Sequence, residues 1–549
     1  MSDNPYHKPQ RPSPGGLTRR EVFQTGSMLA LPALFGTVKA PAAEGPLTPG
    51  PRIYQSIGVE PVINCRGTYT IIGGSVELPE VRAAMDAAAQ HYVQIDELAE
   101  AVGQRLAELT GAEWGMVSAG CAAGLKHVAA ACVAGGNPEK LIRIPDLTDL
   151  DKTEAIIPTA SRNVYDHAIR NVGVKVINVD TLAELENAIS PRTALIYTGG
   201  SATGELTLEA IVKVAKPKNV PVLVDAAAQV LTIPCVHLQR GADIVGYSGG
   251  KAICGPQCAG LLLGRKDILL SAWQASSPHH GPGRDNKVGR EETLGMLAAV
   301  EAWIKRDHQA EWRKWLGWLD TISTRISNID GVTTAVREPP GLGNRSPSLV
   351  ITWSPAQLNI TGEEVAELVA RTKPRIALAA EGGSPSNPLD PGKTSISVTA
   401  WMMQPGEDKI VADRLHEVLA QKRSPRSPMK PPIANLNGRW DATVEFFSSK
   451  SEHVLFIEQN GNDIQGTHRG DFSTRDMYGI IDGDRLTLRS TMRVPGDSVN
   501  YIFSGAVSGD TISGPIHMGE YLTAKFTAKR HSYPEPRSIV VPKGPPLAN

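Results

Sequence analysis

The chain lacks several features that mark common protein classes. Aromatic residues make up only 5% of its 549 residues, which argues against a stacking platform for single-stranded nucleic acid. The formal net charge is −1, so no basic surface for nucleic acid or anionic membrane is indicated. The six cysteines include no C-x-x-C pair, which leaves no zinc-type spacing and no expected metal. The remaining composition, 41% hydrophobic and 21% charged, is that of a globular protein suited to small-molecule substrates.

The N-terminal 43 residues differ from the rest. Thr18-Arg19-Arg20 precedes an apolar run over 28–38 that is too short to span a bilayer, and small residues follow it. This order resembles a twin-arginine export signal cleaved near Ala40 or Ala43, so we expect a periplasmic or secreted protein with no membrane span after cleavage. A disordered tail with a chance arginine pair is the alternative.

Strands and helices alternate after this segment. Apolar strands are predicted at 115–118, 174–179, 193–198, 220–225, 244–248 and 259–263, with helices at 79–109, 122–134, 206–215 and 293–318. Such alternation predicts an α/β fold with a mostly parallel sheet covered by helices on both faces. We assign residues 44–318 to this large domain and 319–420 to a small α+β domain with helices at 362–371 and 407–419.

The last part of the chain has a different pattern. Residues 421–433 are rich in proline and cations and are predicted to form a linker. From 434 to 531 about eight short alternating runs are separated by Asn460-Gly461, Asp482-Gly483 and Gly509-Asp510, which are hairpin signals. This pattern predicts a small antiparallel barrel followed by a disordered tail, 532–549. A passive stabilising or docking module is favoured over an independent ligand pocket, because a barrel of this size is largely filled by its own side chains.

A single lysine stands in a turn of small residues between two apolar strands. Ser248-Gly249-Gly250-Lys251 follows one strand, and the next begins at Ala259. A surface lysine needs no such setting, whereas a lysine that forms an imine must be reachable and partly desolvated. Asp225 ends another strand of the predicted parallel sheet, where ligands bind. Taken alone, Asp225 would be interpreted as a helix cap or a loop carboxylate, which is the commoner use of such a residue.

A third segment strengthens the reactive-lysine hypothesis. The turn over 118–122 joins a strand to a helix, and its backbone N–H groups at the helix start are suited to a phosphate. The turn has neither the G-x-G-x-x-G pattern nor the P-loop pattern. The hydroxyl of Ser248 could reach the same phosphate. A phosphate site, a carboxylate and a reactive lysine together indicate pyridoxal 5'-phosphate as the cofactor.

The motifs resemble one group of fold-type-I pyridoxal-phosphate enzymes, the group related to selenocysteine synthase and D-glucosaminate-6-phosphate ammonia-lyase. The segments that carry this resemblance lie in order between about Ile53 and Leu419: PVINCRGTYTIIGGS, VSAGCAAG, PVLVDAAAQ, SGGKAICGPQCAG and DNKVGREE. The Asp and Ser-x-x-Lys elements are shared by the whole fold type, while K-x-x-x-GPQ and KVGREE are more specific to this group.

The resemblance implies a role for individual residues. Lys251 would form the Schiff base with the cofactor and move the Cα proton, and Asp225 would keep the pyridine nitrogen protonated. The main chain of Gly120, Cys121 and Ala122, with Ser248, would hold the phosphate. The resemblance also implies at least a homodimer, because a neighbouring subunit completes the pocket in this fold type.

Arg66 and Arg375 are candidates for binding a substrate carboxylate, with an ordinary ion pair as the alternative for each. Two departures from the group bear on the substrate. No ring-stacking aromatic or histidine is evident beside Asp225, and the segment near Ser397 has no arginine where related proteins tend to carry one.

The favoured function is an exported lyase that acts on an amino acid or amino-sugar acid by Cα-proton abstraction and β-elimination. A selenocysteine synthase-like transferase, an amino-acid racemase and a non-catalytic binding protein are the alternatives. Export and the near-neutral charge argue against a tRNA substrate. Intact Lys251 and Asp225 argue against a protein that only binds.

Overall fold

The computed structural model describes residues 46–381 and 392–533, which form two compact units. The first covers residues 46–425 together with 495–497, and the second covers 426–494 and 498–533. The predicted signal, residues 1–43, lies outside the described residues, as does the predicted tail from residue 534 onward. Among the helices of the described ranges, none has the length and apolar character needed to span a membrane.

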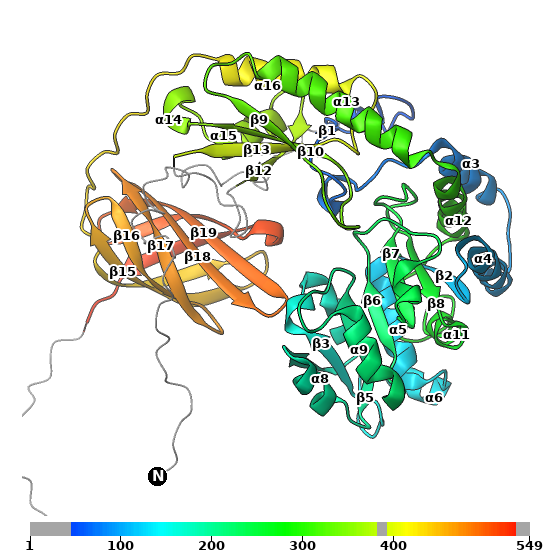
Figure 1. Ribbon diagram of the computed structural model, residues 1–549. Helices are drawn as coiled ribbons and strands as arrows, with labels where there is room; N and C mark the ends of the chain where they lie inside the picture. Colours follow the sequence, from blue (N-terminus) through cyan, green and yellow to red (C-terminus); the bar gives the residue numbers. More distant parts are fainter. Residues whose placement is uncertain (1–45, 382–391, 534–549) are drawn as a thin grey trace, which may run out of the picture. The chain divides into compact units, whose positions relative to one another are not determined.

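A seven-stranded sheet is the frame of the first unit (Figure 1). In spatial order its strands are β2 (Trp114–Ser118), β8 (Gly260–Gly264), β7 (Ile244–Ser248), β6 (Val222–Asp225), β5 (Thr193–Gly199), β3 (Glu154–Pro158) and β4 (Lys175–Val179). The strands from β7 to β4 pair in parallel, and β8 runs antiparallel to both β2 and β7. The predicted mostly parallel sheet is therefore confirmed.

Helices cover both faces of this sheet, as predicted. One face, called here the α12 face, carries α3 (Pro79–Ala88), α4 (Ile95–Thr110), α8 (Leu182–Ala188), α9 (Leu208–Ala215) and α12 (Arg290–Lys305). The other, called the α5 face, carries α5 (Cys121–Ala134), α6 (Pro138–Leu141), α7 (His167–Arg170) and α11 (Lys266–Gln274). Alternate residues of a strand point to opposite faces. On β6, Val222 and Val224 pack on the α12 face and Leu223 packs on the α5 face.

Two helices predicted as continuous, over 79–109 and 293–318, are each broken. The first ends at Ala88, and α4 begins after Gln94, whose side chain accepts a hydrogen bond from Glu97 N at 2.7 Å. Between them Tyr92 is 97% exposed, so the segment buries too little apolar surface to continue the helix. The second breaks where Asp307 caps α13 (His308–Ile326), accepting from the backbone N–H groups of Gln309 and Ala310.

The smaller part of the first unit is built on an antiparallel sheet. Its strands, in spatial order, are β12 (Ala379–Glu381), β13 (Thr394–Thr399), β10 (Ser348–Trp353) and β9 (Thr333–Arg337). Helices α13, α15 (Gly362–Arg371) and α16 (Glu407–Ala420) share its hydrophobic core. A short parallel pair, β1 (Ile63–Asn64) with β11 (Ile376–Ala377), joins the N-terminal segment to this part. Three short helices complete the unit: α2 (Ile53–Ser56), α10 (Val236–Gln239) and α14 (Pro355–Leu358).

The second unit is a closed antiparallel barrel of eight strands, which confirms the predicted fold (Figure 1). Its strands are β14 (Gly438–Glu445), β15 (Lys450–Asn460), β16 (Asp463–Arg469), β17 (Thr474–Asp482), β18 (Arg485–Val494), β19 (Asp497–Ser508), β20 (Thr511–His517) and β21 (Thr523–Arg530). Gly461, Gly483 and Gly509 lie in the predicted turns with φ near +60°, where glycine has no Cβ penalty. Pairing of β14 with β21 closes the barrel around Trp440, Phe503 and Phe526.

Candidate active site

The turn that carries Lys251 packs tightly against the chain that follows it. A Cβ on Gly250 would lie 2.5 Å from Gln257 Cα, and one on Gly249 would lie 2.8 Å from Ala259 O. The two glycines are therefore needed for the turn itself to close, and not only for a ligand to approach the lysine. The turn begins at the carboxyl end of β7, directly after Ser248.

Asp225 ends the neighbouring strand and is held by two donors. Its carboxylate accepts from Tyr197 Oη at 2.7 Å and from Ala227 N at 3.0 Å. Tyr197 is fully buried among residues of the α5 face, so Asp225 lies on that face too. Burial, and then the charge and hydrogen bond of Asp225, raise the pKa of Tyr197. The phenol thus stays a hydrogen-bond donor to the carboxylate.

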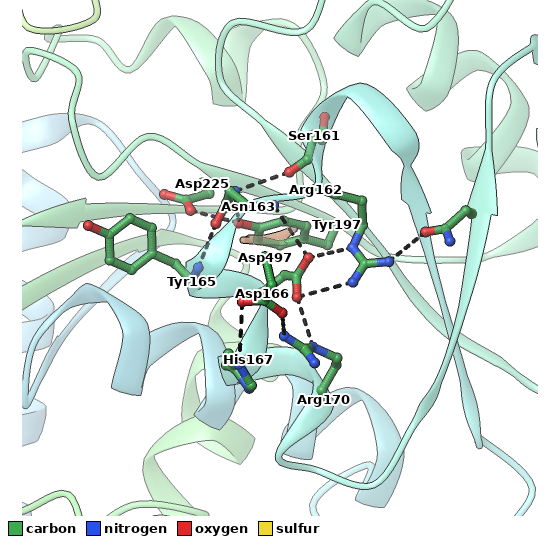
Figure 2. A network of polar contacts seen from close by, with 11 residues as sticks. Ser161, Arg162, Asn163, Tyr165, Asp166, His167, Arg170, Tyr197, Asp225 and Asp497 are labelled. Carbon is green, nitrogen blue, oxygen red and sulfur yellow. Dashed lines mark hydrogen bonds and ion pairs between the residues drawn. The ribbon is translucent and has the colours of Figure 1, made fainter. Parts of the chain in front are cut away.

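A second layer of contacts holds Tyr197. Asn163 Nδ2 donates to Tyr197 Oη at 3.2 Å and to Ser161 O at 3.1 Å, while Asn163 Oδ1 accepts from Tyr165 N at 2.8 Å. Figure 2 shows this line of contacts from Asp225 through Tyr197 and Asn163 to Tyr165. The carboxylate is therefore held by the buried phenol of Tyr197, which half-buried Asn163 supports in turn.

The start of α5 presents free backbone N–H groups. Gly120 precedes the helix with φ +87°, and no side chain caps it. The first helical bond runs from Gly124 N to Gly120 O, which leaves the N–H groups of Cys121 and Ala122 outside the helical ladder. Burial raises the pKa of the Cys121 thiol, followed by the charge of Asp225, while Lys251 opposes this rise. The start of α5 lies against the neighbouring strands: a Cβ on Gly246 of β7 would lie 3.1 Å from Cys121 Sγ, and one on Gly260 of β8 would lie 2.5 Å from Cys121 N.

Tyr165 is the functional candidate that the sequence did not reveal. Its ring centroid lies 6.0 Å from Lys251 Nζ, and the residue is 55% exposed. Tyr165 follows β3. The short apolar run over 154–158 was not predicted as a strand, so no aromatic residue was expected at its end. An exposed ring opposite the lysine offers a stacking surface for a planar heterocycle.

The two predicted arginines lie in different surroundings. Arg66 stands in a tight loop in which Asn64 Oδ1 accepts from the N–H groups of Arg66 and Gly67, both at 3.0 Å. Its guanidinium lies 4.6 Å from the ring centroid of Tyr69, and its Nε is buried without a hydrogen-bond partner among the described residues. The same segment reaches the lysine turn, because Ser75 N donates to Gly250 O at 3.0 Å.

Arg375 is engaged by the main chain. Its Nε donates to Ala370 O at 2.7 Å and its Nη1 donates to Glu60 O at 2.9 Å. These bonds hold the segment after α15 against the N-terminal segment beside the β1–β11 pair. Its assignment to a substrate carboxylate stays a prediction.

The groups that converge suit a pyridoxal phosphate. Free N–H groups at a helix start suit its phosphate, Asp225 suits the pyridine nitrogen, Tyr165 suits the ring and Lys251 suits the aldehyde. Four different strand ends (after β2, β3, β6 and β7) supply these groups at the carboxyl edge of one sheet, where the fold positions ligands.

Comparison with known proteins supports the family and the cofactor. Residues 153–285 match the aminotransferase class-V family. The chain is 32% identical over 302 residues to D-glucosaminate-6-phosphate ammonia lyase from Salmonella typhimurium, covering 52% of this chain and 79% of that protein. It is 29% identical over 385 residues to 5'-C-glycyluridine monooxygenase-decarboxylase from a Streptomyces species, covering 67% and 92%. A solved structure of D-glucosaminate-6-phosphate ammonia-lyase superposes with a TM-score of 0.59 at 27% identity, covering 68% of this chain and 98% of that one.

Proposed function

Because the chain belongs to the fold-type-I pyridoxal-phosphate enzymes, in the group of D-glucosaminate-6-phosphate ammonia lyase, we propose that it is a lyase. It would remove the Cα proton of an amino acid or amino-sugar acid and eliminate a β-substituent. The observation that carries this proposal is the meeting of Lys251, Asp225, Tyr165 and the α5 start at one sheet edge.

The cofactor, when bound, supplies an electron sink for the negative charge that develops at Cα. Asp225 would hold a proton on the ring nitrogen, since Tyr197 and Ala227 N keep its carboxylate in place. Lys251 Nζ would take the proton from Cα and return one to the departing group. Tyr165 would contact the ring, and the backbone N–H groups of Cys121 and Ala122 would hold the phosphate.

Arg66 is the better placed of the two arginines for the substrate carboxylate. Its Nε has no partner within the described residues, whereas Nε and Nη1 of Arg375 are both occupied by carbonyl groups. A guanidinium donates to a carboxylate in a fixed fork geometry. Trp401 Nε1 lies 3.3 Å from the position that a Cβ on Gly67 would take, so a bulky indole borders this loop.

The direct test measures products from a panel of amino acids and amino-sugar acids incubated with the purified holoenzyme. Release of ammonia together with a 2-oxo acid in equal amounts supports the lyase. Inversion of Cα without ammonia identifies the racemase alternative instead. Exchange of the β-substituent without a 2-oxo acid identifies a transferase, and either result contradicts the proposal.

A second candidate is an oxygen-dependent decarboxylation of a glycyl-substituted nucleoside. It is favoured by the match to the Streptomyces protein, which extends over 385 residues and so includes the smaller part of the first unit. An oxygen electrode with such a substrate separates the two candidates, because β-elimination consumes no oxygen.

We further propose export by the twin-arginine route and assembly as at least a homodimer. Replacing Arg19 and Arg20 by lysine should retain the protein in the cytoplasm, and unchanged export contradicts the first proposal. A monomer in light scattering that keeps cofactor and turnover contradicts the second.

A further inference from the structure

A large cavity lies beside the lysine turn in the first unit. Its volume is about 860 Å³, within the range of small-molecule sites. Six segments line it: the end of α12, the start of α13, the turn after Lys251, and the loops over 230–233, 338–345 and 401–402. Ala252 and Cys254 form part of its wall, directly after Lys251.

This cavity is separate from the cofactor site. Ala252, Trp303 and Trp401 belong to the hydrophobic core of the α12 face. Cys121 and Tyr197, the partner of Asp225, belong to the core of the α5 face. The cavity thus borders the lysine turn on the α12 face of the sheet. The cofactor-binding groups border the same turn on the α5 face.

The cavity wall next to the lysine turn is fixed by Arg306. Its Nη1 donates to Ala252 O at 3.1 Å, and its Nε and Nη2 donate to the two carboxylate oxygens of Glu311, each at 3.0 Å. Its guanidinium also lies 4.9 Å from the Trp303 ring centroid. All of its groups are engaged, so Arg306 shapes the cavity and leaves ligand binding to other residues.

Two tryptophans of α13 form an aromatic part of the cavity wall. Trp312 and Trp315 meet edge to face, with centroids 6.1 Å apart, and Trp312 Nε1 donates to Glu338 at 2.9 Å. That hydrogen bond fixes the plane of the Trp312 indole. Indole faces held in this way favour flat, unsaturated ligands over branched aliphatic ones.

Two arginines of the cavity lining, Arg313 and Arg345, form no ion pair within the described part of the chain. Neither Arg313 nor Arg345 makes a hydrogen bond or ion pair with any described residue, and the Arg345 guanidinium lies 5.9 Å from the Trp312 ring centroid. The loop of Arg345 is held in place, because Val230 N donates to Leu342 O at 3.0 Å and Asn344 N donates to Ala228 O at 2.7 Å. A preformed pocket with unpaired guanidinium groups attracts an anion.

We propose that this cavity is a second ligand site, which binds a small planar aromatic carboxylate. The ring of the ligand packs against Trp312 and Trp315, and its acid group pairs with Arg345. The site goes beyond the proposed lyase reaction, since no group of the cofactor site lines it.

The test is isothermal titration calorimetry of the full-chain holoenzyme with 2-naphthoate. Saturable binding of one molecule per chain is expected. Neutral 2-naphthamide and non-planar cyclohexanecarboxylate should each bind at least about tenfold more weakly. The proposal is overturned if naphthoate shows no saturable binding, or if both comparison compounds match it.

Variants locate the site. Arg345→Gln should weaken naphthoate about tenfold and leave naphthamide unchanged, whereas Trp312→Leu should weaken both. Lys314→Gln, on α13 but outside the cavity lining, is the matched control and should change neither. Binding lost in Arg66→Gln but retained in Arg345→Gln would place the probe at the cofactor site and refute the proposal. Naphthoate-induced dissociation of subunits in light scattering would make the cavity an interface and refute it as well.

Discussion

The two units of this chain are built from different aromatic residues. Of eight phenylalanines, Phe23 and Phe35 precede the described residues and the other six lie in the barrel. Eight of the nine tryptophans and all six cysteines lie in the first unit, called the α/β unit from here on. In the barrel the rings of Phe503 and Phe526 meet edge to face at 5.1 Å in the interior, so inward positions are used for packing. In the α/β unit the chemistry-bearing groups stand at strand ends, outside the packed core.

This difference separates what each unit can do. A parallel sheet packs small aliphatic residues against helices and leaves its carboxyl edge open for a ligand. The barrel closes on itself, and three of its buried polar side chains bond to one another: His453 Nδ1 lies 2.8 Å from His468 Nε2, and His468 Nδ1 lies 2.9 Å from Ser490 Oγ. This contrast supports the proposal that the reaction takes place in the α/β unit, and a supporting role for the barrel stays a prediction.

The largest expected effect comes from Lys251→Ala. Loss of the amine removes both the cofactor linkage and the proton carrier, so turnover should fall by at least ~10²-fold. The unfolding transition of the barrel should not change, because the substitution lies outside it. Calorimetry and a product assay on the same sample measure both. Lys287→Ala, an exposed lysine of the same unit, is the control, and equal loss in both variants would contradict the separation of roles.

The reverse experiment is Phe503→Ala. Removing this fully buried ring should cost about 3–5 kcal/mol of barrel stability through lost burial and a cavity. Cofactor absorbance and turnover should persist at temperatures below the lowered barrel transition. Phe472→Ala, at a residue that is 96% exposed, should leave both transitions unchanged. If Phe503→Ala lowers both transitions together, the two units are not independent.

A pH titration tests a property that the two units share, a buried histidine whose pKa is lowered. Burial, followed by nearby His453 and Arg475, lowers the pKa of His468 to about 3, and burial followed by Lys126 lowers the pKa of His127 in the α/β unit to about 4. An unfolded histidine titrates near 6.5, so below that pH the unfolded state binds protons that the folded state excludes. Each group should therefore remove up to about 1.4 kcal/mol of stability per pH unit as the pH falls from 6.5 toward its folded value.

The variant His468→Gln isolates the contribution of this histidine to the pH dependence of barrel stability. It should flatten the pH dependence of the barrel transition between pH 6.5 and 4 and leave that of the α/β transition as it was. Urea unfolding at several pH values measures both slopes. An unchanged barrel slope would show that His468 is not held neutral.

The smallest expected effect is that of Tyr197→Phe. It removes one of two donors to Asp225, so cofactor affinity should fall by about three- to tenfold, the worth of one buried hydrogen bond. Tyr247→Phe is the control, because this buried phenol contacts Cys235 Sγ at 3.3 Å and not Asp225. Fluorescence titration of the apoprotein with cofactor measures both. Equal affinity in wild type and Tyr197→Phe would remove Tyr197 from the site.

The sequence predicted the sheet, the barrel and the residues at two strand ends, because apolar runs and turn residues are local signals. Asp225 and Lys251 were visible for this reason. Tyr165 was missed since its strand, Glu154–Pro158, is a run of only five residues with an acid at one end and a proline at the other. The bond of Arg375 to Glu60 depends on pairing between segments more than 300 residues apart, which no local pattern reveals. The two helix breaks were missed as well, because one follows from the exposure of the segment around Tyr92 and the other from the side-chain cap that Asp307 forms.

The proposed lyase reaction requires a covalent bond between the cofactor and Lys251. Borohydride reduction followed by peptide mapping tests this bond directly. The predicted result is a pyridoxyl label on Lys251 alone, with stoichiometry near one per chain. Lys126, whose Nζ pairs with Asp285 at 2.8 Å, and exposed Lys287 should stay unlabelled. A label on either of them, or no label at all on protein that retains its visible absorbance, would contradict the proposed site.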